Sequence, residues 1–144
     1  MSDPKGAQGF FDMPDQASPA DASFPTGEPT LRALAMPADT NPHGDIFGGW
    51  LVGQMDLAGT IIGTRCAGGR VVTVAITEMS FHHPVMVGDE VTCFGKVNKI
   101  GHTSVTIGIE SWVRRGTGGD PIKVTEGVFT YVHVGDNNRP LPVG

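Results

Sequence analysis

The chain has 144 residues, enough for one ordinary domain and too few for two. A hydrophobic content of 39% with 17% charged residues is typical of a globular protein and excludes an intrinsically disordered one. The net charge of -5 argues against a nucleic-acid-binding protein, which usually carries a basic face. No apolar run approaches the roughly 20 residues that cross a bilayer, and the N-terminus lacks the pattern of a secretion signal. With two cysteines and no metal-type spacing, we expect a cytoplasmic protein that binds neither nucleic acid nor membrane.

The composition of the chain changes near Thr30. Residues 1–29 are rich in Pro, Gly, Ala, Ser and Asp and show no periodicity, which predicts a disordered N-terminal tail. The ordered domain is expected over residues 30–144 and begins with a short strand over residues 31–36, ended by Pro37. Turn-forming residues are dense over residues 38–44 and predict a loop.

One long helix is predicted over residues 46–66, closed by a glycine cap at Gly68 and Gly69. A broad apolar side of its helical wheel is expected to pack on a sheet. That side comprises Phe47, Trp50, Leu51, Met55, Leu57, Ala58, Ile61 and Ile62. The opposite stripe comprises Gly49, Gly53, Asp56, Thr60 and Gly63.

The glycines of this stripe need an explanation, because each costs about 1 kcal/mol relative to alanine in a helix. Close approach of another backbone or a ligand along the helix would supply one. The alternative is an exposed helix face on which Asp56 is simply solvated. A solvated face normally carries Lys and Glu, whereas Asp56 is the only ionisable residue between positions 46 and 62. We therefore predict that Asp56 lies partly desolvated in a narrow groove and acts as a base or a nucleophile.

Asp45 precedes the helix, and Gly48 and Gly49 lie in its first turn. Asp45 is either the N-cap or a polar group of an active site. The unpaired first-turn N–H groups are predicted to bind the carbonyl oxygen of an ester or thioester as negative charge develops on it. Asp45 and Asp56 are about 16 Å apart along a helix, so they cannot share one site within a chain. Two antiparallel helices across a twofold axis would bring Asp45 of one chain to Asp56 of the other.

Four apolar runs follow the helix, each alternating with period two and separated by turn signals. In each run, alternate residues are expected to share one face of the strand. In chain order these residues are Val72, Val74 and Ile76; Val91, Cys93 and Val97; Val105, Ile107, Ile109 and Val113; and Ile122, Val124, Val128 and Val132. Short links predict an antiparallel meander with the helix on one face, which is an α+β domain. The opposite face would carry a second subunit or scattered surface aromatics. The residues expected there are Met79, Phe81, Phe94, Trp112, Phe129 and Tyr131.

Four segments together resemble the YciA-type acyl-CoA thioester hydrolases, which are related to the brain-type acyl-CoA hydrolases. These segments are LRALAMPADTNPHGDIFGGWLVGQMDLAG, GRVVTVAITEMSFHHPVMVGDEV, KIGHTSV and VTEGVFTYVHV. The resemblance covers roughly residues 30–143. It implies a hot-dog fold, an antiparallel sheet wrapped around one long central helix. It also implies a homo-oligomer, at least a dimer and usually a trimer of dimers, that hydrolyses acyl-CoA to free CoA and a carboxylic acid.

The resemblance also assigns roles to residues. Asp56 falls on the catalytic base or nucleophile, Asp45 on the polar residue ahead of FGG, and the amides of Gly49 and Gly48 on the groups that polarise the thioester carbonyl. Candidate substrate and CoA contacts, with Arg115 as a further cation, are Asn41, Thr60, Arg70, Thr73, Lys99, Gly101, His102, Thr103, Ser104 and Arg114.

No cofactor is expected beyond the coenzyme A of the substrate. No metal is expected either, because the adjacent His82 and His83 point to opposite faces of a strand. A non-catalytic acyl-CoA-binding protein on the same scaffold is the first alternative function. A hot-dog hydratase or dehydratase ranks below it, because no histidine lies on the Asp56 stripe.

Overall fold

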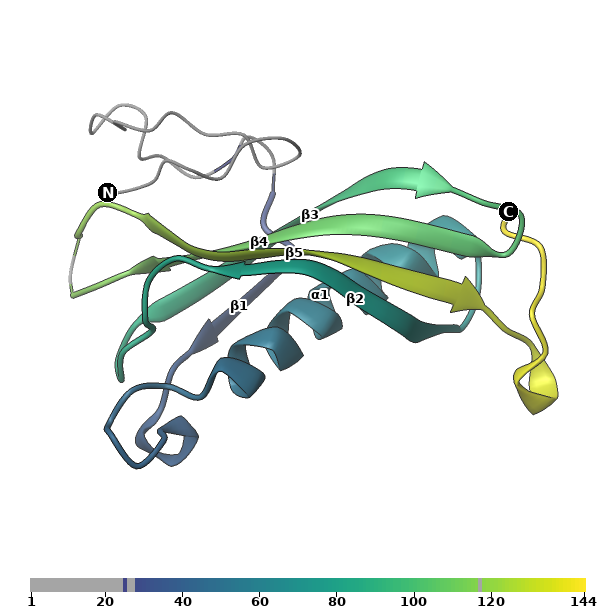
Figure 1. Cartoon of the computed structure of the whole chain (residues 1–144). Helices are drawn as coiled ribbons and strands as arrows, with labels where there is room; N and C mark the ends of the chain where they lie inside the picture. Colours follow the sequence, from purple (N-terminus) through teal and green to yellow (C-terminus); the bar gives the residue numbers. More distant parts are fainter. Residues whose placement is uncertain (1–24, 26–27, 117) are drawn as a thin grey trace.

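The computed structural model describes residues 25, 28–116 and 118–144. The predicted tail, residues 1–29, therefore lies outside the described residues except for Pro25, Glu28 and Pro29. The described elements are β1 (Leu31–Leu34), η2 (Pro37–Asp39), α1 (Gly48–Ala67), β2 (Val71–Phe81), β3 (Glu90–Ile100), β4 (Ser104–Arg114), β5 (Ile122–His133) and η3 (Asp136–Asn138). The strands form one antiparallel sheet, and α1 lies along one of its faces (Figure 1). This arrangement confirms the predicted α+β hot-dog architecture.

The strand order in the sheet is β1-β3-β4-β5-β2. The hairpins β3–β4 and β4–β5 follow the predicted meander. The prediction is wrong for β2, which pairs with β5 instead of β3. The connection over residues 82–89 is longer than a tight hairpin turn and carries the chain from the edge strand β2 to β3, on the far side of β4 and β5. As a result, β1 and β2 are the edge strands, each paired on one side only.

The helix begins two residues later than predicted. The N–H of Ile46 donates to the carbonyl oxygen of Val85 at 3.0 Å, and Ile46 forms a β-bridge with Thr40, so its backbone is extended. Phe47 is the N-cap and provides no side-chain hydrogen bond, which rules out the N-cap interpretation of Asp45. At the other end Gly68 adopts the left-handed conformation, and its N–H donates to the carbonyl oxygen of Thr64 at 3.0 Å. The predicted glycine cap is confirmed. No helix in the described part of the chain is long and apolar enough to cross a membrane.

The buried side of α1 is rotated from the predicted one. Leu57 and Ile61 were expected to pack on the sheet but are 55% and 37% exposed. Gly63, expected on the opposite stripe, is buried, as is Gly59. A Cβ at Gly59 would lie 2.7 Å from Cζ of Tyr131 and 2.8 Å from Cδ1 of Ile109. Gly59 and Gly63 therefore lie against the sheet, which permits a close approach of the two layers.

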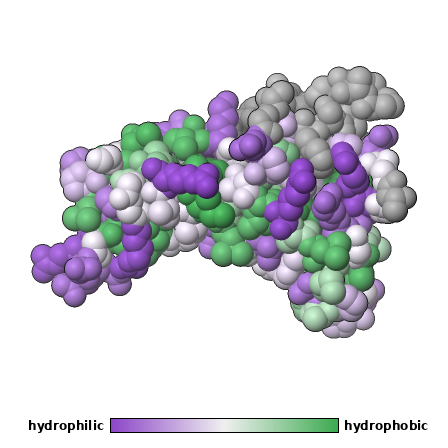
Figure 2. All heavy atoms as spheres, turned by 180° about the vertical axis from the view of Figure 1, so that it is seen from behind, coloured by the Kyte–Doolittle hydropathy of each residue, from purple (hydrophilic) through white to green (hydrophobic). Residues whose placement is uncertain are grey.

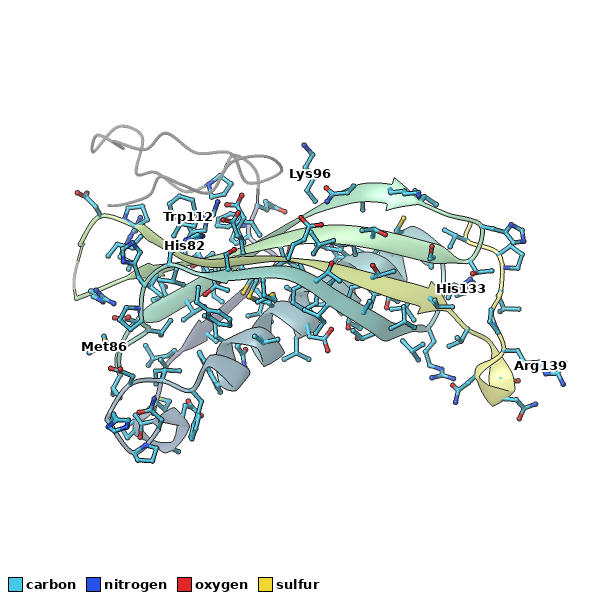
Figure 3. All side chains as sticks on the ribbon, viewed as in Figure 1. His82, Met86, Lys96, Trp112, His133 and Arg139 are labelled. Carbon is cyan, nitrogen blue, oxygen red and sulfur yellow. The ribbon has the colours of Figure 1, made fainter. Side chains whose placement is uncertain are left out.

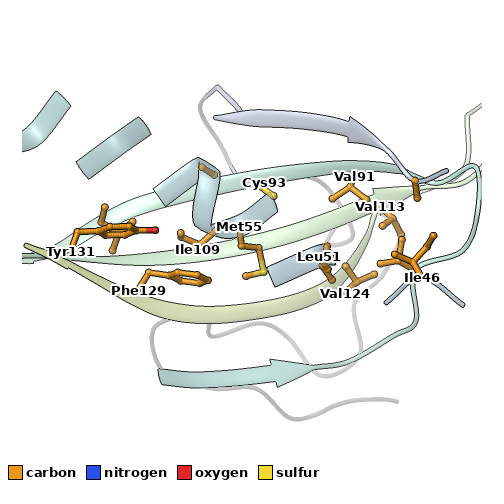
Figure 4. Close-up of a cluster of buried hydrophobic side chains, with 14 of the residues drawn as sticks. Ile46, Leu51, Met55, Val91, Cys93, Ile109, Val113, Val124, Phe129 and Tyr131 are labelled. Atoms are coloured by element: carbon orange, nitrogen blue, oxygen red, sulfur yellow. The ribbon is translucent and has the colours of Figure 1, made fainter. Parts of the chain in front are cut away.

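The core lies between α1 and the sheet (Figure 4). The predicted inner faces of β3 and β4 are confirmed, and their fully buried members are Val91, Cys93, Val105, Ile107, Ile109 and Val113. Burial of Cys93 raises the pKa of its thiol to about 12, so Cys93 behaves as an apolar core residue at neutral pH.

The predicted inner faces of β2 and β5 are wrong in part, because both strands contain irregularities in register. Ser111 of β4 pairs with Thr125, but the next residue, Trp112, pairs with Lys123, so Val124 is an extra residue in β5. An extra residue reverses which of the following side chains face the helix. Phe129 and Tyr131 therefore face the helix and are fully buried, in place of Val128 and Val132.

On β2 the register shifts between Thr73 and Ala75 and again between Thr77 and Ser80. Val72 pairs with Val132, whereas Ile76 pairs with the inward-facing Phe129. Val72 and Ile76 thus lie on different faces, against the prediction. Glu78, within the second irregularity, has a positive φ of 52°.

Because of these shifts, the aromatic residues expected on the outer face no longer support the prediction of a second subunit. Phe129 and Tyr131 belong to the core, and Phe94 and Trp112 are nearly buried on the outer face at 8% exposure. Large apolar side chains are exposed on the β2 edge strand instead, namely Val74, Ile76 and Phe81. Seen from behind, the surface has several hydrophobic areas interrupted by hydrophilic residues (Figure 2). The unpaired backbone edge and these exposed side chains favour β2 as the surface that contacts a second subunit.

Two glycine-to-alanine substitutions on α1 distinguish the effect of close packing on stability from the effect of helix propensity. Gly59→Ala is expected to lower the free energy of unfolding by about 2–3 kcal/mol, because its Cβ overlaps with Tyr131 and Ile109. Gly53→Ala is the matched control: nothing lies within 4 Å of its Cβ, so we expect a gain of about 0.5–1 kcal/mol. Urea unfolding monitored by circular dichroism measures both. Equal effects of the two substitutions would contradict the packing described above.

Candidate active site

The carboxylate of Asp56 lies in the middle of α1 and is half-buried. Its Oδ1 accepts hydrogen bonds from the hydroxyls of Thr73 and Tyr131, both at 2.8 Å. The Tyr131 hydroxyl also lies 3.1 Å from the backbone oxygen of Asp56. Among the described residues no side chain donates to Oδ2. Asp56 is therefore fixed against the sheet through one oxygen, rather than solvated on an open helix face.

The register of the sheet brings the two donors together. Thr73 of β2 and Tyr131 of β5 are directly paired, so their side chains lie on the same face, toward α1. Burial raises the pKa of the Tyr131 phenol, and its hydrogen bond to Asp56 raises it further. The phenol is consequently protonated at neutral pH and able to donate. Thr60, one turn beyond Asp56, donates its hydroxyl to the backbone oxygen of Asp56 at 2.9 Å.

A second group of predicted site residues surrounds the N-terminus of α1. The side-chain oxygen of Asn41 accepts the N–H groups of His43 at 2.9 Å and Asp45 at 3.1 Å, which closes the loop before the helix. Gly48 and Gly49 form the exposed first turn, and no side chain caps it. The first-turn N–H groups are therefore available to a carbonyl oxygen.

A cavity of about 240 Å³ adjoins this helix end. Its lining comprises Ile46, Phe47, Gly48, Leu51, Phe81, His82, His83, Pro84 and Val85. Most of these side chains are apolar, and the ring of Phe81 lies 3.5 Å from where a Cβ on Gly48 would be. A side chain at position 48 would therefore narrow the cavity between the first turn of α1 and Phe81.

The two groups are separated within one chain, because Asp56 lies eight residues beyond Gly48, about 12 Å along α1. Tyr131, which contacts Asp56, and Ile46, which lines the cavity, occupy the two ends of the buried cluster (Figure 4). The structure thus brings Asp56, Thr60 and Thr73 together and places Asn41, Asp45, Gly48 and Gly49 elsewhere. This agrees with the separation expected from their spacing along the helix.

The predicted CoA contacts also separate. Lys99 and His102 are exposed at the turn between β3 and β4, near the C-terminal end of α1. In the same region the N–H of Gly101 donates to the carbonyl oxygen of Ser104, and the carbonyl oxygen of Thr103 accepts the N–H of His133.

The predicted arginines have different surroundings. Arg70 donates to the side chain of Asn138 and to the carbonyl oxygen of Gly135, and so holds the C-terminal turn. Arg114 lies at the far end of β4, opposite Glu90. Arg115 is paired with Asp89, its Nε lying 3.2 Å from each carboxylate oxygen. No single surface of one protomer presents all the predicted cations.

His82 belongs to a charged cluster on the sheet rather than to the Asp56 site. Its Nε2 lies 2.7 Å from Oε2 of Glu126, and Oε1 of Glu126 lies 3.1 Å from Nζ of Lys123. His82 and Trp112 lie near one end of the sheet, and His133 near the other (Figure 3). Across the described ranges, no three His, Cys, Asp or Glu residues cluster in a way that would hold a metal ion.

Two residues at the site were missed by the sequence analysis in this role. Tyr131 was placed on the outer face, because a register shift cannot be read from the alternation of apolar residues. Gly59 was not considered at all. A fourth glycine in the interior of a helix was the available signal, since such a residue usually has a packing reason.

The geometry defines a hot-dog domain with a carboxylate held at the interface of its helix and sheet. Residues 43–119 match the thioesterase superfamily. The acyl-CoA thioester hydrolase YciA of Escherichia coli is 50% identical over 127 residues, covering 84% of this chain and 96% of that protein.

Two solved structures are similar over most of their length. The hexameric thioesterase y2039 from Yersinia pestis has a TM-score of 0.79 and 52% identity, covering 85% of this chain and 99% of that one. Cj0915, a hexameric hotdog fold thioesterase of Campylobacter jejuni, has a TM-score of 0.77 and 40% identity, with 82% and 91% covered. The chain belongs to the thioesterase superfamily, in the group of the YciA-type acyl-CoA thioester hydrolases.

Proposed function

We propose that this protein hydrolyses acyl-CoA thioesters to free CoA and a carboxylic acid, with Asp56 as the catalytic carboxylate. The observation that carries the proposal is the half-buried Asp56, held through Oδ1 by Thr73 and Tyr131 while no side chain of the described residues donates to Oδ2. The relative YciA, named as an acyl-CoA thioester hydrolase, supports the substrate class. The two free cysteines, Cys66 and Cys93, fit work in the reducing cytoplasm.

The chemistry follows from the two separated groups. First-turn amides of Gly48 and Gly49 polarise the thioester carbonyl and stabilise the oxyanion. Asp56 either takes a proton from the attacking water or attacks the carbonyl carbon itself, forming an anhydride that water then opens. In both routes the C–S bond breaks, the CoA sulfur leaves and is protonated, and the acyl group is released as a carboxylic acid.

Each active site requires two copies of the chain. Asp56 lies eight residues beyond Gly48 on α1, about 12 Å along the helix, so one protomer cannot place both on the same carbonyl group. A twofold axis beside β2 brings Asp56 of one protomer toward the Gly48–Gly49 turn and Asp45 of its partner. The unpaired edge of β2 and its exposed Val74, Ile76 and Phe81 favour that contact. Three such dimers would form a hexamer like that of the relatives y2039 and Cj0915.

Replacing Asp56 by asparagine tests the catalytic assignment. Asp56→Asn keeps the size of the side chain and an acceptor for Thr73 and Tyr131 but removes the base. We expect kcat/KM to fall by roughly 10²–10⁴-fold, the usual contribution of a general base. Free thiol release from a series running from acetyl-CoA to palmitoyl-CoA measures this, and CoA binding by calorimetry should persist.

The matched control for this substitution is Asp136→Asn, an exposed aspartate in η3 that contacts none of the site residues described above. It is expected to retain wild-type turnover. A wild-type protein that binds CoA yet cleaves no thioester of any chain length would be a binding protein, and the proposal of hydrolysis would be wrong.

A charge on the β2 edge tests the two-subunit site. Val74→Glu is expected to separate the dimer into monomers and abolish hydrolysis, because it brings two like charges together across the twofold axis. Leu34→Glu is the matched control, since Leu34 is also 55% exposed but lies on the other edge strand, β1. Light scattering after size exclusion gives the mass of each variant. A monomeric variant with full activity would contradict a shared site.

A further inference from the structure

Gly59 and Tyr131 form a close contact between α1 and β5, one turn beyond Asp56. A Cβ on Gly59 would overlap with the hydroxyl of Tyr131 and lie 2.7 Å from its Cζ. The glycine therefore creates the space that the phenol occupies. A glycine inside a helix costs about 1 kcal/mol relative to alanine, so this opening is obtained at the expense of helix stability.

The Tyr131 hydroxyl is itself unfavourable for the core. Tyr131 is 0% exposed, and a buried hydroxyl costs free energy unless it is hydrogen-bonded. Phenylalanine would fill the same ring space without that requirement. This hydroxyl donates to Oδ1 of Asp56, lies 3.1 Å from its backbone oxygen, and is also hydrogen-bonded to the side chain of Thr60. Two locally unfavourable residues, Gly59 and Tyr131, thus meet at the one carboxylate of the helix interior.

The orientation of the Asp56 carboxylate depends on this contact. The terminal torsion of an aspartate is broad and nearly twofold, so an unrestrained carboxylate samples many orientations. Here Thr73 and Tyr131 both donate to Oδ1 at 2.8 Å, from two different strands. Their convergence fixes the plane of the carboxylate and directs Oδ2 away from the two donors.

We propose that Tyr131, admitted by Gly59, is a positioning residue that orients Asp56 so that Oδ2 is the oxygen that acts in the reaction. The inference rests on the proposed function, because it assigns a task to an oxygen of the proposed catalytic carboxylate. In this role Tyr131 acts on the reaction through Asp56 and not by binding the substrate. The raised pKa of its phenol keeps the proton available for this hydrogen bond at neutral pH.

The test removes only the hydroxyl. Tyr131→Phe is expected to lower kcat by about 10-fold with KM nearly unchanged, because small displacements of a reacting group are costly in rate while Thr73 still holds Oδ1. A crystal structure of the variant is expected to show the Asp56 carboxylate in a changed orientation or in more than one. Both readouts report on positioning, whereas a loss of packing would appear in stability.

Phe129→Leu is the matched control, because Phe129 is equally buried on the same face of β5, two residues away. It is expected to lower the urea midpoint while leaving kcat near that of the wild type. A Tyr131→Phe variant with wild-type kcat, or a loss of kcat that Phe129→Leu reproduces, would overturn the positioning role.

The same measurements separate this inference from the proposed function. If the wild type is active and Asp56→Asn is not, the proposed function stands whatever Tyr131→Phe does. If Asp56→Asn keeps its activity, the catalytic assignment of Asp56 and the positioning role of Tyr131 fall together, while the proposed hydrolysis stands.

Discussion

The fold depends on the close approach of α1 to the strands β2 and β5. Gly59 and Gly63 have no side chains to separate the layers, and Tyr131 and Val71 fill the space above them. A helix seated this deeply places its flank against the strands, so that Asp56 comes within hydrogen-bonding distance of Thr73 and Tyr131. Core packing and the geometry of the candidate active site therefore share the same few atoms.

The separation of polar groups along the helix has an equally direct effect. The amides at its N-terminus and the carboxylate in its middle are each well placed, but they are separated by about 12 Å along the helix. A rigid helix cannot bend them together, so the fold provides two half-sites per protomer. Under the proposed function, catalysis then becomes a property of the assembly, and association is a condition for turnover.

Much of this was predictable, and the failures have a common physical cause. The helix, its glycine cap and the inner faces of β3 and β4 followed from periodicity, because these elements are regular. The faces of β2 and β5 did not, because one extra residue in a strand reverses every side chain after it and leaves no signal in the composition. Asp56 was identifiable as the only ionisable residue between positions 46 and 62, whereas its donor Tyr131 was hidden by the shift in β5.

The unpaired edge of β2 has a consequence for the newly made chain. A protomer that has folded but not yet found its partner presents free backbone N–H and C=O groups beside Val74 and Ile76. Such an edge can pair with any extended polypeptide, including an unrelated nascent chain. Under the proposed two-subunit site, dimerisation must therefore outpace aggregation during synthesis, and low expression at moderate temperature favours the assembly by limiting the number of open edges present at once.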